Sequence, residues 1–204
     1  MSALDRFLRS STLPSLVKIA LAHVQLETIH PFRDGNGRIG RLMISLLLCS
    51  SGLLSEPLLY VSVHLKTHRR EYYDRLQSVR SDGDWEGWVR FFLEALIASS
   101  EQALTAARAI LGLFERNRRQ LSTSSSALRV FEQLQKRPIT SVAQLQQSVG
   151  LTYPTVSAAL ELMKKLGFVN ELTGKKRNRL FAYAPYIDLL SEGADPLNVS
   201  PTRR

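Results

Sequence analysis

HPFRDGNGRIGR, residues 30–41, joins two apolar segments with helical spacing and decides the fold around it. The first segment, residues 13–29, is expected to be a helix that ends at His30, because Pro31 disfavours helical backbone in the residue before it. The second segment, residues 38–51, is apolar nearly all round and ends before Gly52, so we expect a buried central helix.

The loop of this stretch has the composition of an anion-binding site. Gly35 and Gly37 let the backbone approach a ligand closely, and the N–H groups that open the next helix direct a partial positive charge at it. Arg38 and Arg41 are three residues apart, so both side chains lie on one face of that helix and can contact successive phosphates.

Three further residues of the stretch offer metal binding, phosphate binding and base catalysis. Asp34 provides the oxygen ligand that Mg²⁺ prefers, and Asn36 can donate to a phosphate oxygen. His30 can accept a proton near neutral pH. A histidine before proline is more often structural and Gly-Asn-Gly alone is usually a turn, yet an ordinary helix junction does not require two arginines beside a base and a carboxylate.

Composition restricts the class of protein. The chain has 204 residues and a formal net charge of +9, which favours an anionic partner. The single cysteine, Cys49, forms no disulfide within the chain and is expected to be buried. The most apolar run, residues 42–49, is shorter than the roughly 20 residues of a membrane span, and no secretory signal is evident, so a cytoplasmic protein without a membrane partner is predicted.

The rest of the chain predicts further helices and a second domain. Helical spacing recurs over 65–79 and again from Trp85 to about residue 118. Whether a break interrupts this second helix stays open. Tyr72, Tyr73 and Leu76 are expected to form one stripe, and Trp85 and Trp88 are core candidates. The polar run 120–126 reads as a linker, and residues 187–204 carry no periodic pattern and are expected to be a tail.

Residues 127–186 contain nine basic and three acidic residues. Helices are expected over 127–134, 140–149 and 153–166, with Gly150 at a tight junction, followed by strands over 168–172 and 180–183. This order resembles the winged-helix family, with a two-stranded wing. Four cations of the wing turn are candidates for DNA phosphate contacts: Lys175, Lys176, Arg177 and Arg179.

The stretch 30–41 matches without a mismatch the signature HxFx(D/E)GNGRxxR of the Fic family. The resemblance implies a mainly α fold: a Fic-type helical bundle over residues 1–119, followed by the small winged helix-turn-helix domain. It also implies an enzyme, a nucleotidyltransferase that moves AMP from ATP onto a Ser, Thr or Tyr hydroxyl of a target protein with Mg²⁺ as cofactor. In that scheme His30 is the base, Asp34 the metal ligand, and the nucleotide is held by Gly35, Asn36, Gly37, Arg38 and Arg41.

Two features of the Fic family are expected to be missing. The chain begins about thirty residues before His30, which leaves no room for the β-hairpin flap that docks the target. No (S/T)xxxE(G/N) inhibitory pattern is found. Alternatives therefore stay open: a DNA-binding regulator whose Fic half senses nucleotide, or a remnant that binds ATP and modifies nothing. A homodimer is also left open.

Overall fold

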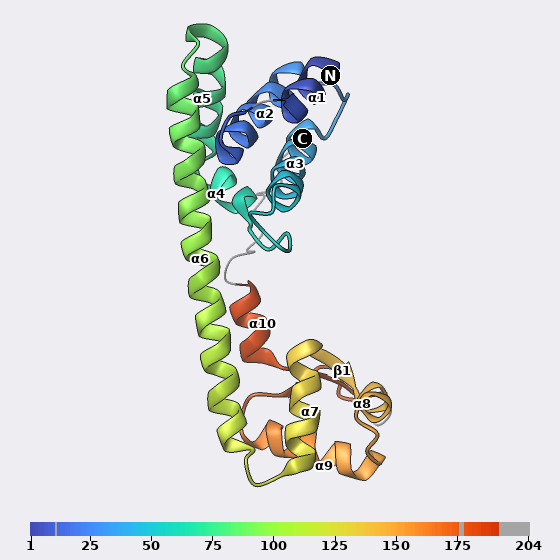
Figure 1. Ribbon diagram of the computed structural model, residues 1–204. Coiled ribbons are helices and arrows are strands. Elements are labelled where there is room, and N and C mark those ends of the chain that lie inside the picture. The colour runs from blue at the N-terminus through green and yellow to red at the C-terminus, as the bar shows by residue number, and fades with distance from the viewer. Residues whose placement is uncertain (11, 176–177, 192–204) are drawn as a thin grey trace, which may run out of the picture. The chain divides into compact units, whose positions relative to one another are not determined.

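The computed structural model describes residues 1–10, 12–175 and 178–191 (Figure 1). The chain forms two compact units, Met1–Leu104 and Thr105–Arg204. The division falls within one continuous helix, α6 (Trp85–Gln120), whereas the sequence suggests a joint at 120–126. At that place the structure has the end of α6, a short turn and Ser124, whose hydroxyl caps the next helix by accepting a hydrogen bond from the Ala127 N–H at 3.3 Å.

The first unit is helical throughout its described elements. It comprises α1 (Ser2–Ser10), α2 (Ser15–Ile29), α3 (Asn36–Ser50), α4 (Val61–Thr67), α5 (Arg69–Asp82) and the first part of α6. The sequence missed α1, a short helix that packs Leu4 against Ala22 and Leu26. Tertiary packing of this kind stabilises helices too short to persist alone.

The core of the first unit forms where α6 meets α2. Trp88 and Phe92 are fully buried, and the Trp88 indole N–H donates to the Ala20 carbonyl at 2.8 Å. Two expectations are wrong here: Trp85 is 43% exposed and Tyr73 is 52% exposed. Neither side chain is part of the buried core.

The expectation that α3 is buried all round is also wrong. Its buried stripe contains Gly40, Ile44 and Leu48, whereas Leu42 and Leu46 are 58% and 57% exposed. An apolar helix in a unit of this size is covered only on the side that has neighbours. Cys49, expected to be buried, is only half-buried.

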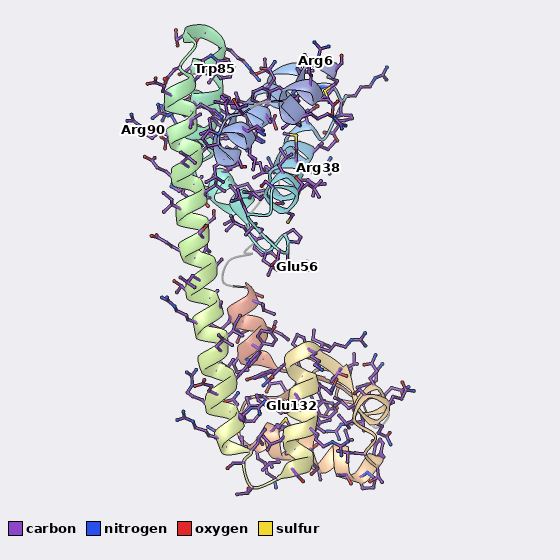
Figure 2. All side chains as sticks on the ribbon, in the orientation of Figure 1. Arg6, Arg38, Glu56, Trp85, Arg90 and Glu132 are labelled. Atoms are coloured by element: carbon purple, nitrogen blue, oxygen red, sulfur yellow. The ribbon has the colours of Figure 1, made fainter. Side chains whose placement is uncertain are left out.

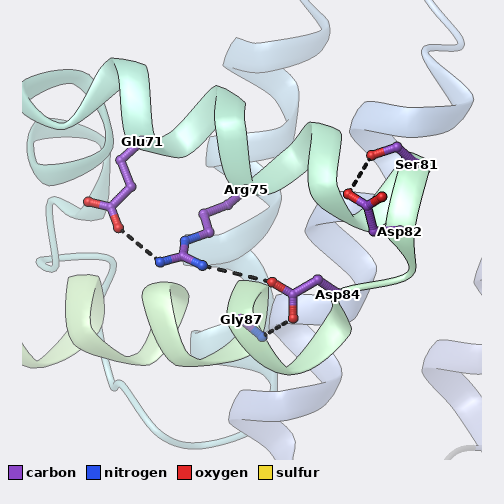
Figure 3. A network of polar contacts seen from close by, with 6 residues as sticks. All are labelled: Glu71, Arg75, Ser81, Asp82, Asp84 and Gly87. Carbon is purple, nitrogen blue, oxygen red and sulfur yellow. Dashed lines mark hydrogen bonds and ion pairs between the residues drawn. The ribbon is translucent and has the colours of Figure 1, made fainter.

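A network of polar contacts fixes the turn between α5 and α6 (Figure 3). Gly83 ends α5 with a φ of 69°, and the Asp84 carboxylate accepts a hydrogen bond from the Gly87 N–H at 2.9 Å, as an N-cap does. Arg75 lies 3.8 Å from Asp84 and 3.4 Å from Glu71. Asp84 therefore caps the start of α6.

The second unit combines helices with a small antiparallel sheet. After the last part of α6 it comprises α7 (Ser125–Lys136), β1 (Ile139–Ser141), α8 (Val142–Val149), α9 (Tyr153–Lys165), β2 (Asn170–Glu171), β3 (Leu180–Ala182) and α10 (Ala184–Ser191). The strand order is β1-β3-β2, and Phe181 of β3 is in register with Thr140 on one side and Glu171 on the other.

The sheet of this unit is larger than expected. The two expected strands are present in shorter form as β2 and β3, which pair antiparallel. Pro138 precedes an extended β-branched pair, Ile139 and Thr140, which joins β3 as a third strand. The helix expected from residue 140 therefore begins at Val142, after Ser141 forms a capping box with Gln144. Part of the expected tail is helical, since α10 reaches Ser191; residues 192–204 lie outside the described ranges.

The junction between α8 and α9 is as predicted, with Gly150 at a φ of 63°. The core of this unit contains Phe131, Leu160, Phe181 and Tyr183, all fully buried. Among the described residues, no helix is long and apolar enough to cross a bilayer.

Candidate active site at the turn between α2 and α3

The helix α2 carries His30 into the turn. The backbone N–H of His30 donates to the Leu26 carbonyl at 3.0 Å, and His30 itself has φ 49° and ψ 56°, the left-handed conformation. Pro31 excludes a further helical turn, and the imidazole is exposed. The structure therefore presents the ring to solvent at the end of the helix.

Arg80 of α5 holds this end of α2 in place. Its Nη2 donates to the Glu27 carbonyl at 2.9 Å and its Nε donates to Thr28 Oγ1 at 3.3 Å. A cation at a helix C-terminus satisfies free carbonyl groups and opposes the negative end of the helix dipole. This role of Arg80 was not predicted from the sequence.

Replacing Arg80 by methionine should lower the free energy of unfolding of the first unit by about 1–2 kcal/mol, because a charged hydrogen bond to a helix end is lost. Both tryptophans, Trp85 and Trp88, belong to this unit, so urea unfolding followed by tryptophan fluorescence measures it. Arg70→Met is the matched control, since the Arg70 side chain is 98% exposed. Equal unfolding free energies for the two variants would contradict the prediction.

Asn36 closes the loop. Its Oδ1 accepts a hydrogen bond from the Phe32 N–H at 2.9 Å and its Nδ2 donates to the Phe32 carbonyl at 2.6 Å, and Asn36 is only 3% exposed. The sequence assigned this amide to a phosphate, whereas in this structure both of its ends contact the backbone of the loop. The Phe32 ring is 44% exposed, so it is the backbone of Phe32 that holds the loop.

Gly35 is the N-cap of α3 and has a φ of 84°. The Gly35 N–H donates to Asp34 Oδ1 at 2.7 Å, and Asp34 Oδ2 lies 3.1 Å from Arg38 Nη2. The side chains of Asp34 and Arg38 are 91% and 75% exposed, so this ion pair is weak and both groups can exchange it for a ligand. Figure 2 shows Arg38 on α3.

Asp34 fits Mg²⁺ as one exposed carboxylate. Within the described ranges, no group of three or more His, Cys, Asp or Glu side chains could hold a metal ion. Mg²⁺ is commonly bound by one or two carboxylates together with substrate phosphates. A magnesium ion at Asp34 would therefore need the nucleotide to complete its coordination.

At Gly37 and Gly40 the missing Cβ lets neighbouring side chains approach the backbone of α3 closely, and neither glycine has a positive φ. A Cβ on Gly37 would lie 3.1 Å from Arg41 Nη1, and a Cβ on Gly40 would lie 2.5 Å from Glu27 Oε1. Arg41 therefore folds back over the first turn of α3, while α2 and α3 pack closely at Gly40. A glycine inside a helical pattern often marks a close packing contact, so the position of Gly40 in the sequence could have indicated this one.

A buried hydrogen-bonded chain supports the loop from behind. His23 Nδ1 lies 3.1 Å from the Gly40 carbonyl and Nε2 lies 2.9 Å from the Tyr72 hydroxyl. Because a carbonyl only accepts, Nδ1 carries the proton and Nε2 accepts from Tyr72. Burial lowers the pKa of His23 to about 4, and the nearby Arg41 charge acts in the same direction. This buried, hydrogen-bonded environment gives His23 a structural role.

The stability of the first unit should depend on the protonation of His23. In the unfolded chain His23 binds a proton near pH 6.5, and in the folded chain only near pH 4. The free energy of unfolding therefore has its full value above pH 6.5. It should fall by about 3 kcal/mol as the pH falls to 4. Urea unfolding at each pH, followed by tryptophan fluorescence, measures this.

His23→Gln is the control variant, and it should flatten the profile between pH 6.5 and 4. Burial raises the pKa of the Glu27 carboxyl, so Glu27 stabilises the folded state more at low pH and opposes the His23 effect. The fall should therefore steepen in Glu27→Gln. A wild-type profile that is level over this range would contradict the role of His23.

The structure places only part of the predicted wing cations. Arg179 Nη2 lies 2.7 Å from Glu161 Oε1 and 2.7 Å from Glu171 Oε2, and its guanidinium lies over the Phe181 ring. Its two carboxylate partners raise the pKa of Arg179, so Arg179 ties α9 to the sheet and is not a free phosphate contact. Lys175 is exposed; Lys176 and Arg177 lie outside the described residues. DNA contact by this turn stays a prediction.

Comparison with known proteins finds a family match at the N-terminal part of the chain. Residues 1–48 match the Fic/DOC family. Those 48 residues contain α1, α2, the loop and most of α3.

Individual relatives match over a longer part of the chain. A protein named protein adenylyltransferase Fic from Aedes aegypti is 44% identical over 75 residues, which are 37% of this chain and 14% of that protein. The protein of the same name from Drosophila melanogaster is 36% identical over 97 residues, 46% of this chain and 18% of that protein. The chain thus matches less than a fifth of the length of these relatives.

A solved structure shares the fold. A Fic family protein from Desulfovibrio desulfuricans G20 superposes with a TM-score of 0.51 at 22% identity, covering 89% of this chain and 53% of that one. At this identity the likeness concerns the fold. It supports the expectation of a mainly helical, Fic-type arrangement.

Proposed function

We propose that this chain is a protein adenylyltransferase, which transfers AMP from ATP to a hydroxyl side chain of a target protein. The observation that carries the proposal is the turn itself: an exposed imidazole at the end of α2 faces solvent beside the helix N-terminus and arginines of α3. The adenylyltransferase names of the Aedes and Drosophila relatives support the same reaction.

The residues of the turn supply the chemistry that this reaction needs. The target hydroxyl oxygen bonds to the α-phosphorus, its proton passes to His30, and the bond between the α- and β-phosphates breaks to release pyrophosphate. The N–H groups of the first turn of α3 stabilise the negative charge on the phosphate oxygens.

Arg38 and Arg41 hold the β- and γ-phosphates and neutralise the leaving pyrophosphate. Asp34 would hold Mg²⁺, which adds positive charge at the phosphates when it is bound. Asn36 keeps the loop closed through Phe32, so that the positions of His30 and the helix N-terminus stay fixed relative to each other.

Labelled ATP tests the proposal. Purified protein with Mg²⁺ and a cell lysate should transfer label from ATP marked on the α-phosphate to itself or to a lysate protein, above the labelling by the lysate alone. It should add no label from the γ-phosphate to that transferred by the lysate alone. Label from the γ-phosphate would indicate phosphoryl transfer instead. No label from either position would reject the proposal for this chain.

A further inference from the structure

Glu27 is a buried carboxylate with an unsatisfied oxygen directly behind the loop. It lies on α2, three residues before His30, and is 7% exposed. Among the side chains that the structure describes, its Oε1 is the buried polar atom without a hydrogen-bond partner. A buried acceptor without a hydrogen-bond partner is unfavourable, so the unpaired oxygen of Glu27 needs an explanation, such as a functional role.

The unsatisfied oxygen and the Arg41 guanidinium converge on one point at the start of α3. A Cβ on Gly37 would lie 3.8 Å from Glu27 Oε1 and 3.1 Å from Arg41 Nη1. Within the described ranges Arg41 forms no ion pair. Arg41 and Glu27 are linked by the electrostatic attraction between their charges and not by a hydrogen bond of Glu27 Oε1.

Three basic side chains interact electrostatically with Glu27. Burial raises the pKa of the Glu27 carboxyl, whereas the charges of Arg41, His30 and Arg80 lower it. Glu27 thus interacts with both Arg41 on α3 and Arg80 on α5. Loss of the Glu27 charge would remove an attraction that acts on both guanidinium groups.

We propose that Glu27 is a positioning residue for Arg41: its buried carboxylate holds the guanidinium over Gly37, at the N-terminus of α3, where the terminal phosphates of ATP bind. The proposal rests on the nucleotide site of the proposed function and adds a residue to it. Glu27 itself contacts no phosphate. It lowers the conformational entropy that Arg41 loses when the nucleotide binds.

Calorimetric titration with ATP or AMP in the presence of Mg²⁺ tests this positioning role. Glu27→Gln should weaken ATP binding about five-fold, which corresponds to ordering one long side chain, and should leave AMP binding unchanged because AMP lacks the phosphates that Arg41 holds. In an Arg41→Ala background, Glu27→Gln should have no further effect on ATP, as expected when one residue acts through another.

Two further variants keep the test decisive. Glu94→Gln makes the same chemical change on an exposed position of α6 and should bind ATP like the wild type. If Glu27→Gln fails to fold, Glu27→Asp keeps the charge but withdraws it by one methylene, and it should show the same pattern with a smaller loss. Tryptophan fluorescence of each variant reports whether the first unit is folded.

Three results would overturn the positioning role. These are an equal loss of ATP affinity in the Arg41→Ala background, an equal loss of AMP affinity, and tighter binding of ATP by Glu27→Gln. A wild-type chain that binds no ATP would overturn the proposed function and this role together. ATP binding without label transfer would reject adenylyl transfer alone and leave the role of Glu27 standing.

Discussion

Replacing His30 by glycine should abolish AMP transfer and leave the chain at least as stable as the wild type. A base that removes a proton in the transition state commonly contributes about 10²–10⁴-fold to the rate, so transfer should fall by that factor. Stability should not fall, because His30 has a φ of 49°, a conformation that favours glycine.

His30→Ala separates the two effects. Alanine removes the same imidazole, so the loss of transfer should equal that of His30→Gly. Its Cβ is as unfavourable in the left-handed conformation as that of histidine. The free energy of unfolding of His30→Gly should therefore exceed that of His30→Ala by about 1 kcal/mol. Both variants keep the backbone N–H that bonds to Leu26.

The two measurements are initial rates of label transfer from α-labelled ATP and urea unfolding followed by tryptophan fluorescence. Transfer by His30→Gly at the wild-type rate would show that His30 is not the base. A lower stability of His30→Gly than of His30→Ala would show that the left-handed backbone at this position is not a source of strain.

Replacing Gly40 by alanine should destabilise the first unit, although helix propensity alone predicts the opposite. Within a helix, alanine is favoured over glycine by about 1 kcal/mol. At Gly40, however, the added Cβ would lie 2.5 Å from Glu27 Oε1 and 3.1 Å from the His23 ring. Both neighbours are buried, and overpacking of this kind typically costs about 1–3 kcal/mol.

Gly112→Ala is the matched control. Gly112 also lies inside a helix, α6, and its added Cβ would meet only the end of the Arg116 side chain, at 3.3 Å. This side chain can move, so Gly112→Ala should raise the midpoint of thermal unfolding followed by circular dichroism, and Gly40→Ala should lower it. A rise for both variants would show that α2 and α3 can accommodate the methyl group.

Gly40→Ala should also weaken ATP binding, because Glu27 and His23 both contact Gly40 and both lie behind the loop. This links packing between α2 and α3 to the candidate site. Normal ATP affinity in a folded Gly40→Ala variant would separate the two.

The local features of the site could be predicted because each depends on neighbours in the sequence. The helix α3, expected from residue 38, begins two residues earlier at Asn36. Pro31 ends α2 at His30 through a steric contact with its neighbour. The same holds for Gly150 between α8 and α9. The sequence alone therefore determined where the turn lies and which polar groups it contains.

Features that depend on partners distant in the sequence could not be predicted. Arg80 contacts Glu27 and Thr28 across more than fifty residues, and β1 forms because β3, some forty residues later, offers it a free edge. Arg179 resembled a free cation of a basic turn until its carboxylate partners on α9 and β2 were known.

The sequence by itself determined which polar groups residues 30–41 carry and the mainly helical class, because composition and spacing fix them locally. The tertiary structure decided which groups are free to meet a ligand. It left His30, Asp34 and Arg38 exposed, used Asn36 to close the loop, and buried Glu27 behind Arg41. Burial and hydrogen bonding depend on neighbours from other helices, and only the folded chain brings those neighbours together.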